Sequence, residues 1–245
     1  MQVTGMLWPT LVIGALLAGC SGGEVVTVED WPEGPPGNSA YGVVAYDGQV
    51  PAKFLKKRRA AVMAQMNPPR VIATADGRIA DAVITLESVA ASAALAAKPP
   101  VTVDVDQEGS IYAPHVAVVP VGSSVRFLNS DRILHNVHLR HDAHTVDQRD
   151  MPAGEKWTLA AGDKARAISI GCNFHPWMSG HIKVVDTPYF GKSDERGRFV
   201  IGDVPDGRYR ALIWHEELVA ASDAPLEIEI KDGQAGPIRL LLSSR

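Results

Sequence analysis

Three side chains that bind soft metal ions lie within one short stretch, Cys172-Asn-Phe-His175-Pro-Trp-Met178. A thiolate favours Cu(I), an imidazole also suits Cu(II), and a thioether makes a weak axial ligand. The stretch therefore predicts a copper site with sulfur and nitrogen ligands. A copper site with two imidazoles and one thiolate in a trigonal plane needs a second histidine from another part of the sheet.

The sequence offers His135 as that second histidine, upstream of the Cys172 stretch. Ile168, Ile170 and Cys172 are spaced by two, and alternate residues of a strand lie on the same face of a sheet. We therefore expect Cys172 to lie on a buried face, as a shielded thiolate ligand requires.

The pattern of an isolated His135-Asn136 followed by a distant Cys-x2-His-x2-Met resembles the cupredoxins, the type 1 blue copper proteins. The two-and-two spacing is similar to the short ligand loop of the amicyanins. The resemblance implies a Greek-key β-sandwich with one type 1 copper, which transfers single electrons between Cu(II) and Cu(I). It also implies the copper ligands, which are His135, Cys172, His175 and, as a long axial contact, Met178.

Three further residues are expected around these ligands. By the resemblance, Asn136 would form a hydrogen bond across to the Cys172 loop. Pro176 and Trp177 would stiffen the loop and keep water off the metal, leaving an edge of His175 as the electron port. Trp177 fits a plain core position equally well, because shielding and packing have the same sequence pattern.

The other histidines give weaker signals. Histidines recur every three residues from His135 through His138 and His141 to His144. Residues three apart in a strand lie on opposite faces, so we expect a histidine-rich surface loop and not a second copper-loading site. The remaining pair, His115 and His181, is expected to be structural.

Two enzymatic interpretations are weaker than the copper site. His215-Glu216 resembles the start of the zinc-protease motif His-Glu-x-x-His, but position 219 is valine. Cys172 and His175 lie too close along one loop to make a good pair of nucleophile and base, and the expected burial of the thiol also argues against a hydrolase. We therefore expect no catalytic residues.

The first 20 residues resemble a bacterial lipoprotein signal peptide. The apolar run from Met6 to Gly19 is too short to span a bilayer. Leu17-Ala18-Gly19-Cys20 resembles a lipobox, in which Cys20 becomes the lipidated first residue, and Ser21 is compatible with sorting to the outer membrane. We expect a lipid-anchored, periplasm-facing protein of the bacterial cell envelope, with Cys172 as its single remaining thiol and no disulfide.

Length and composition predict a β protein with a substantial core. The 245 residues are 46% hydrophobic and include 17 prolines and 22 glycines, which is typical of turn-rich β architecture. A formal net charge of −4 gives no nucleic-acid-binding signature. We predict an all-β protein with a Greek-key cupredoxin sandwich, a second small β-sandwich and one short helix.

Turn and strand patterns divide the chain after the signal peptide, residues 1–20. Residues 21–40 are rich in glycine, proline and acidic side chains and are expected to be a flexible tether. Residues 41–110 are expected to form an N-terminal β region with one helix over 52–66. The copper module is expected over 111–187.

Within that module, Val116–Val119 and Val125–Leu128 flank a turn and predict a hairpin. From residue 188 to 245 short strands alternate with Gly- and Pro-containing turns. This last segment resembles the carboxypeptidase-regulatory or transthyretin-like β-sandwich. Domains of this type usually have a stabilising or presenting role and not a catalytic one.

These expectations point to an electron carrier of the cell envelope and not to an enzyme. Its partners would be a redox protein donor, a redox protein acceptor and the membrane, reached through the lipid anchor. Two alternatives stay open. One is a copper-binding or copper-delivery protein, in which the metal is cargo, and the other is an envelope scaffold or adhesion module with a structural metal site.

Overall fold

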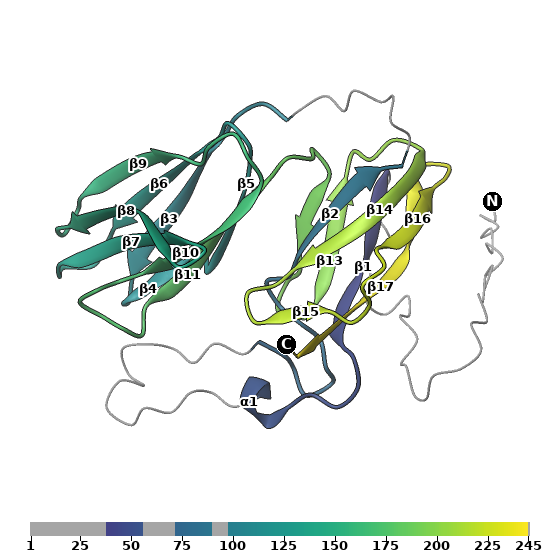
Figure 1. The fold of residues 1–245 in the computed structure, drawn as a ribbon, viewed down its shortest axis with the longest axis horizontal. Helices are drawn as coiled ribbons and strands as arrows, with labels where there is room; N and C mark the ends of the chain where they lie inside the picture. The colour runs from purple at the N-terminus through teal and green to yellow at the C-terminus, as the bar shows by residue number, and fades with distance from the viewer. Residues whose placement is uncertain (1–37, 56–71, 90–97, 245) are drawn as a thin grey trace, which may run out of the picture.

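The computed structural model describes residues 38–55, 72–89 and 98–244, and it consists of two β-sandwiches (Figure 1). The all-β prediction is confirmed. Cys20 and most of the predicted tether lie outside the described residues, as does the predicted helix after Leu55. None of the helices in the described ranges is long and apolar enough to cross a membrane.

The first sandwich lies on the left in Figure 1 and consists of consecutive strands from β3 to β11. One sheet has the order β4-β3-β6-β9, with the bounds Ile111–Ala113, Thr102–Glu108, Ser124–Asn129 and Lys156–Ala160. The facing sheet has the order β5-β11-β10-β7-β8, with the bounds Val116–Pro120, Ser179–Val185, Arg166–Gly171, His135–His141 and His144–Met151.

The second sandwich combines both ends of the described chain. One sheet has the order β13-β1-β17-β15, with the bounds Arg198–Gly202, Ser39–Tyr46, Gln234–Ser244 and Leu218–Ala220. The other has the order β12-β2-β14-β16, with the bounds Phe190–Lys192, Val83–Ser88, Gly207–Trp214 and Leu226–Ile230. The short helix α1, Ala52–Leu55, places Phe54 in the core of this sandwich.

The first sandwich is therefore inserted into the second, and we call them the inserted sandwich and the terminal sandwich. This arrangement corrects the predicted boundaries. Residues 41–110 form no unit, because β1 and β2 pair with C-terminal strands whereas β3 pairs with β6. The inserted sandwich accordingly begins at β3, before residue 111. The alternation of apolar and polar residues identifies a strand, but it does not show which distant strand is its pairing partner.

The predicted hairpin of Val116–Val119 and Val125–Leu128 is wrong. β5 pairs in parallel with β11, whereas β6 pairs with β3 and β9 in the facing sheet. The turn between β5 and β6 thus carries the chain from one sheet of the sandwich to the other. A turn flanked by two alternating runs looks the same in both arrangements.

The two sandwiches meet through a small apolar cluster. Val83 of β2 packs with Val116 of β5 and Val185 of β11, and Trp214 lies against this cluster. The contact also has a polar part, since the ammonium group of Lys192 donates to the carbonyl of Val116 at 3.1 Å. The junction is therefore packed and partly polar.

Candidate metal centre

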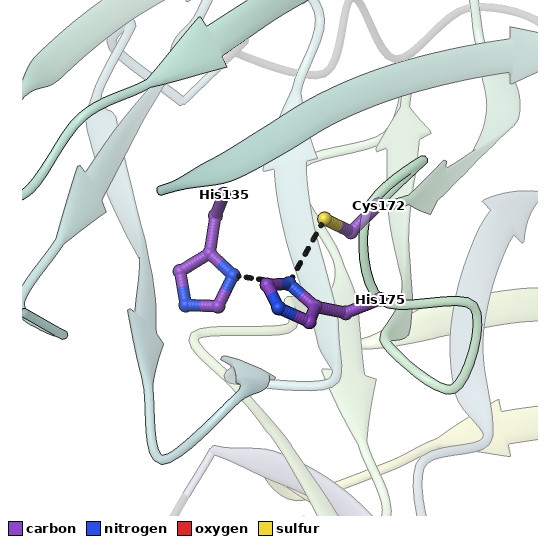
Figure 2. A group of neighbouring side chains, drawn as sticks. All are labelled: His135, Cys172 and His175. Atoms are coloured by element: carbon purple, nitrogen blue, oxygen red, sulfur yellow. Dashed lines mark hydrogen bonds between the residues drawn. The ribbon is translucent and has the colours of Figure 1, made fainter. Parts of the chain in front are cut away.

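The three strongest predicted ligands lie together at one end of the inserted sandwich (Figure 2). Nδ1 of His135 is 3.0 Å from Nδ1 of His175, and Sγ of Cys172 is 3.6 Å from that same nitrogen. A metal ion about 2.0 Å from nitrogen and about 2.3 Å from sulfur, in a trigonal plane, would hold these donors about 3.5 Å apart. The observed separations therefore fit one ion.

Adjacent strands of one sheet bring these ligands together. β10 lies between β7 and β11, and residues 172–178 form the loop from β10 to β11. Gly171 at the end of β10 is opposite His138 of β7, so Cys172 lies beside the end of β7 that carries His135. The backbone N–H of Met178 donates to the carbonyl of His175 at 2.9 Å, which closes the loop in a tight turn.

Cys172 is buried, as the spacing of Ile168, Ile170 and Cys172 predicted. All three side chains belong to the core of the inserted sandwich. The backbone N–H of Asn136 donates to the sulfur at 3.3 Å. A hydrogen bond of this kind stabilises a thiolate in a site from which water is excluded.

Asp131 fixes the ring of His135. Its Oδ2 lies 2.8 Å from Nε2 of His135, and the backbone N–H groups of Gly109 and Ser110 donate to the same carboxylate at 2.8 Å each. Burial raises the pKa of Asp131, but the hydrogen bonds from Ser110, His135 and Gly109 outweigh it and lower the pKa overall. An ionised carboxylate only accepts, so Nε2 carries the proton and Nδ1 presents its lone pair to the site.

His175 is held in its neutral form. Burial, and then the neighbouring His135, lower its pKa below the ordinary value, against a smaller opposing effect of Asp131. A neutral imidazole is the form that binds metals. His135 is completely buried whereas His175 is partly exposed, so His175 is the more accessible of the two rings.

Tyr112 ties together the two strands that carry His135 and Cys172. Its hydroxyl donates to the carbonyl of Asn136 at 2.6 Å and to the carbonyl of Gly171 at 3.0 Å. Burial, with Cys172 as a smaller cause, raises the pKa of Tyr112, so the phenol stays protonated and keeps donating. Neither Tyr112 nor Asp131 was predicted from the sequence, because neither lies in the ligand motif.

The side chain of Asn136 differs from its expected role. Its amide Nδ2 donates to Asp150 on β8 at 2.8 Å, and only its backbone N–H reaches Cys172. The amide oxygen of Asn136 is buried and has no hydrogen-bond partner in the part of the chain that the structure describes. The expected link across to the Cys172 loop is therefore made by the main chain.

The rest of the loop divides between core and surface. Met178 is buried in the same apolar cluster as Cys172, and its role as an axial ligand stays a prediction. The ring of Trp177 lies 5.1 Å from that of His175 between centroids and also packs on the core, and its role in keeping water off a metal stays a prediction. Pro176 is exposed, and its role in stiffening the loop and keeping water off a metal stays a prediction.

The histidines that follow His135 lie on the β7–β8 hairpin. His138 contacts Thr145, His141 contacts the carbonyl of Ala167, and His144 is exposed. In the described ranges, two groups of three or more side chains have donor atoms close enough to share a metal ion. Neither group contains His138, His141 or His144. The second group is His115, His181 and Glu216, which the sequence analysis did not combine.

No protein-family model matches the chain, and no curated protein matches it. Solved structures similar to it include a purple cupredoxin from Nitrosopumilus maritimus, at 19% identity over 34% of this chain and 99% of that chain, with a TM-score of 0.31. An amicyanin from Paracoccus versutus is 19% identical over 41% of this chain and 98% of its own, with a TM-score of 0.32. A copper-containing nitrite reductase from Thermus scotoductus is 25% identical over 41% of this chain and 25% of its own, also with a TM-score of 0.32. Scores this low do not identify a family, so the assignment of the metal rests on the ligand geometry.

Proposed function

We propose that this chain is a type 1 copper electron-transfer protein, with His135, Cys172 and His175 as equatorial ligands and Met178 as the axial one. The observation that supports it is the convergence of Nδ1 of His135, Nδ1 of His175 and Sγ of Cys172 within 4.8 Å of one another. Two imidazoles and one thiolate with a weak thioether are the donor set of blue copper sites.

A bound copper ion would supply the Cu(II)/Cu(I) couple, and the protein holds its ligands fixed while the electron moves. Asp131 orients His135, the Asn136 N–H stabilises the thiolate of Cys172, and Tyr112 joins the strands that carry them. Ligands fixed in this way give little rearrangement between oxidation states, which is what fast electron transfer requires.

The surface beside the site supports an exchange of electrons with other proteins. Ile133 and Leu134 precede His135, and Phe174 precedes His175; the side chains of all three are exposed. The rings of His135 and His175 are 4.7 Å apart between centroids, so the segments that carry these exposed apolar side chains meet at the two histidines. An exposed apolar surface next to a partly exposed ligand suits brief docking of a redox protein donor or acceptor.

The location of the protein is a separate part of the proposal. The lipobox-like sequence before Cys20 supports attachment to a bacterial membrane through a lipid on that residue, and Ser21 supports the outer membrane. A lipid anchor would keep the copper site in the periplasm, within reach of redox proteins of the envelope.

One equivalent of Cu(II), added to the full chain, tests the proposed copper chemistry through visible and electron paramagnetic resonance spectra. We expect an intense thiolate-to-Cu(II) band with narrow hyperfine splitting, and its loss in Cys172→Ser with the fold retained. A weak, tetragonal copper spectrum in the wild-type chain, or a spectrum that Cys172→Ser leaves unchanged, would contradict the proposal.

A further inference from the structure

A second group of metal-binding side chains lies where the two sandwiches meet. His115 lies between β4 and β5, and His181 lies on β11, so both belong to the inserted sandwich. Glu216 comes from the turn between β14 and β15 of the terminal sandwich. Nε2 of His115 is 3.0 Å from each carboxylate oxygen of Glu216, and Nε2 of His181 is 2.6 Å from Oε2. Three donor atoms from separate parts of the chain thus converge.

The backbone holds the two histidines side by side. The N–H of His181 donates to the carbonyl of His115 at 2.7 Å. Gly180 permits this approach, because a Cβ at that position would lie 3.1 Å from Cβ of Tyr112 and 3.2 Å from the carbonyl oxygen of His115. The imidazole rings stand edge to face, with centroids 5.7 Å apart. Their positions are therefore set before any ligand binds.

His215 fixes the turn that presents Glu216. The ring of His215 is buried, and its Nδ1 accepts the backbone N–H groups of Glu217 at 3.1 Å and Leu218 at 3.3 Å. Glu216 is thereby aimed at the two histidines of the inserted sandwich. His215-Glu216 is the pair that resembled the start of a zinc-protease motif, and the histidines that complete the donor set come from the other sandwich, not from position 219.

We propose that His115, His181 and Glu216 bind a divalent transition-metal ion, Zn(II) in particular, between the two sandwiches. Two imidazoles and one carboxylate are a ligand set that zinc adopts with water in the fourth position. Tetrahedral ligands about 2.0–2.1 Å from zinc lie about 3.3 Å from one another, so the contacts at 3.0 Å need to open by about 0.3 Å and the contact at 2.6 Å by about 0.7 Å. The three side chains are mostly buried, with 18, 19 and 8% of their surfaces exposed, which leaves an entry path.

The donor chemistry separates this site from the copper site. Its three donors are nitrogen and oxygen, whereas Cys172 and Met178 supply sulfur to the first site, and soft sulfur ligands are what favour Cu(I). The second site therefore selects a divalent ion. Because its ligands belong to both sandwiches, the ion cross-links them, and binding to the folded state alone raises the midpoint of thermal unfolding. This inference does not depend on the proposed electron transfer.

The test is a calorimetric titration of Zn(II) alone into the full chain carrying Cys172→Ala, which removes the thiolate of the copper site. In this background Glu216→Gln removes the carboxylate, and Glu217→Gln makes the same change at the adjacent exposed residue. We expect one Zn(II) per chain, an affinity at least 100-fold weaker after Glu216→Gln, and an unchanged affinity after Glu217→Gln. Loss of a direct ligand should lower the metal affinity more than loss of a residue that only forms a hydrogen bond to a ligand, which lowers it about 10–100-fold.

Circular dichroism of each variant checks the fold, and His115→Gln is the second ligand variant if Glu216→Gln does not fold. Anomalous diffraction at the zinc edge then locates the ion in the parent chain. A peak between His115, His181 and Glu216 is expected. No Zn(II) binding in the parent chain, equal affinity after Glu216→Gln, or a peak elsewhere would overturn the proposal and leave these residues as a hydrogen-bonded contact between the sandwiches.

Discussion

Asp131 Oδ2 lies 2.8 Å from Nε2 of His135, and the opposite nitrogen of the same ring, Nδ1, faces His175 at 3.0 Å. The carboxylate therefore decides which nitrogen of His135 is available to a metal. The backbone N–H groups of Gly109 and Ser110 hold Asp131 in turn. The orientation of the buried His135 ring thus depends on a turn in the facing sheet.

Asp131→Asn should weaken copper binding by about 10-fold or more, because the amide has a single acceptor oxygen and its NH2 group only donates. It cannot accept from Nε2 of His135 and from both backbone N–H groups as the carboxylate does. The dissociation constant, measured by competition with a chelator, checks this. Asp104→Asn is the matched control, since Asp104 is an exposed carboxylate of the same sandwich that pairs with Arg126. Equal affinity in the two variants would show that Asp131 has no orienting role.

The sequence sufficed to bring His135, Cys172 and His175 together as candidate ligands, because two of them lie in one short loop, and strand alternation predicted the burial of Cys172. It did not suffice for the residues that orient them. Asp131 acts from outside the ligand motif, and Tyr112 acts through carbonyl groups of Asn136 and Gly171 on two other strands. Such contacts depend on strand pairing, which the local pattern does not encode.

Met178→Leu should raise the reduction potential of the bound copper. In the proposed site the thioether is the weak axial donor, and its loss would destabilise Cu(II) more than Cu(I). The core should tolerate the change, since Met and Leu have similar volumes and such exchanges cost less than about 1.5 kcal/mol of unfolding free energy. Voltammetry measures the potential. Met151→Leu, at another buried position of the same core, should leave it unchanged; identical potentials in both variants would remove Met178 from the ligand set.

Tyr112→Phe should lower the unfolding free energy by about 1–3 kcal/mol, because the buried carbonyl of Asn136 and the partly buried carbonyl of Gly171 lose their shared donor. Urea denaturation of the metal-free chain measures the loss. Tyr189→Phe is the control, since within the described part of the chain Tyr189 forms its hydrogen bonds through its backbone, and it should change stability less. A Tyr112→Phe chain as stable as the wild type would mean that these hydrogen bonds do not hold the strands together.

The second β-sandwich and the strands of its C-terminal segment were predictable, because Tyr209 and Ala211 alternate with polar residues and turns separate the strands. The contribution of β1 and β2 to this sandwich was not. Its central strand β1 comes from the other end of the described chain and pairs in parallel with β17 over seven positions. Gly42 of β1 lies against the backbone of Ile238, where a Cβ would clash, so the pairing depends on a glycine. A parallel pair between distant segments has no hairpin turn to reveal it.

Cys20→Ala should release the protein from membranes into the soluble fraction, because a lipid anchor requires that thiol. Fractionation of cells followed by immunoblotting measures the distribution. Ser21→Ala is the control, since it alters the neighbouring residue and keeps the acylated cysteine, and it should stay with the membranes. Retention of the Cys20→Ala chain in the membrane fraction would count against lipidation.

Phe174→Asp should slow electron self-exchange between copies of the copper-loaded protein by about 10-fold or more while leaving the visible spectrum unchanged. The side chain of Phe174 is exposed next to His175, and electron exchange between two copies brings these surfaces together. Two carboxylates facing each other repel, which disfavours the encounter. Line broadening in nuclear magnetic resonance spectra of mixed oxidation states measures the rate. Val200→Asp adds the same charge at an exposed position of the terminal sandwich and should leave the rate nearly unchanged, whereas equal slowing by both changes would mean that electrons do not leave through His175.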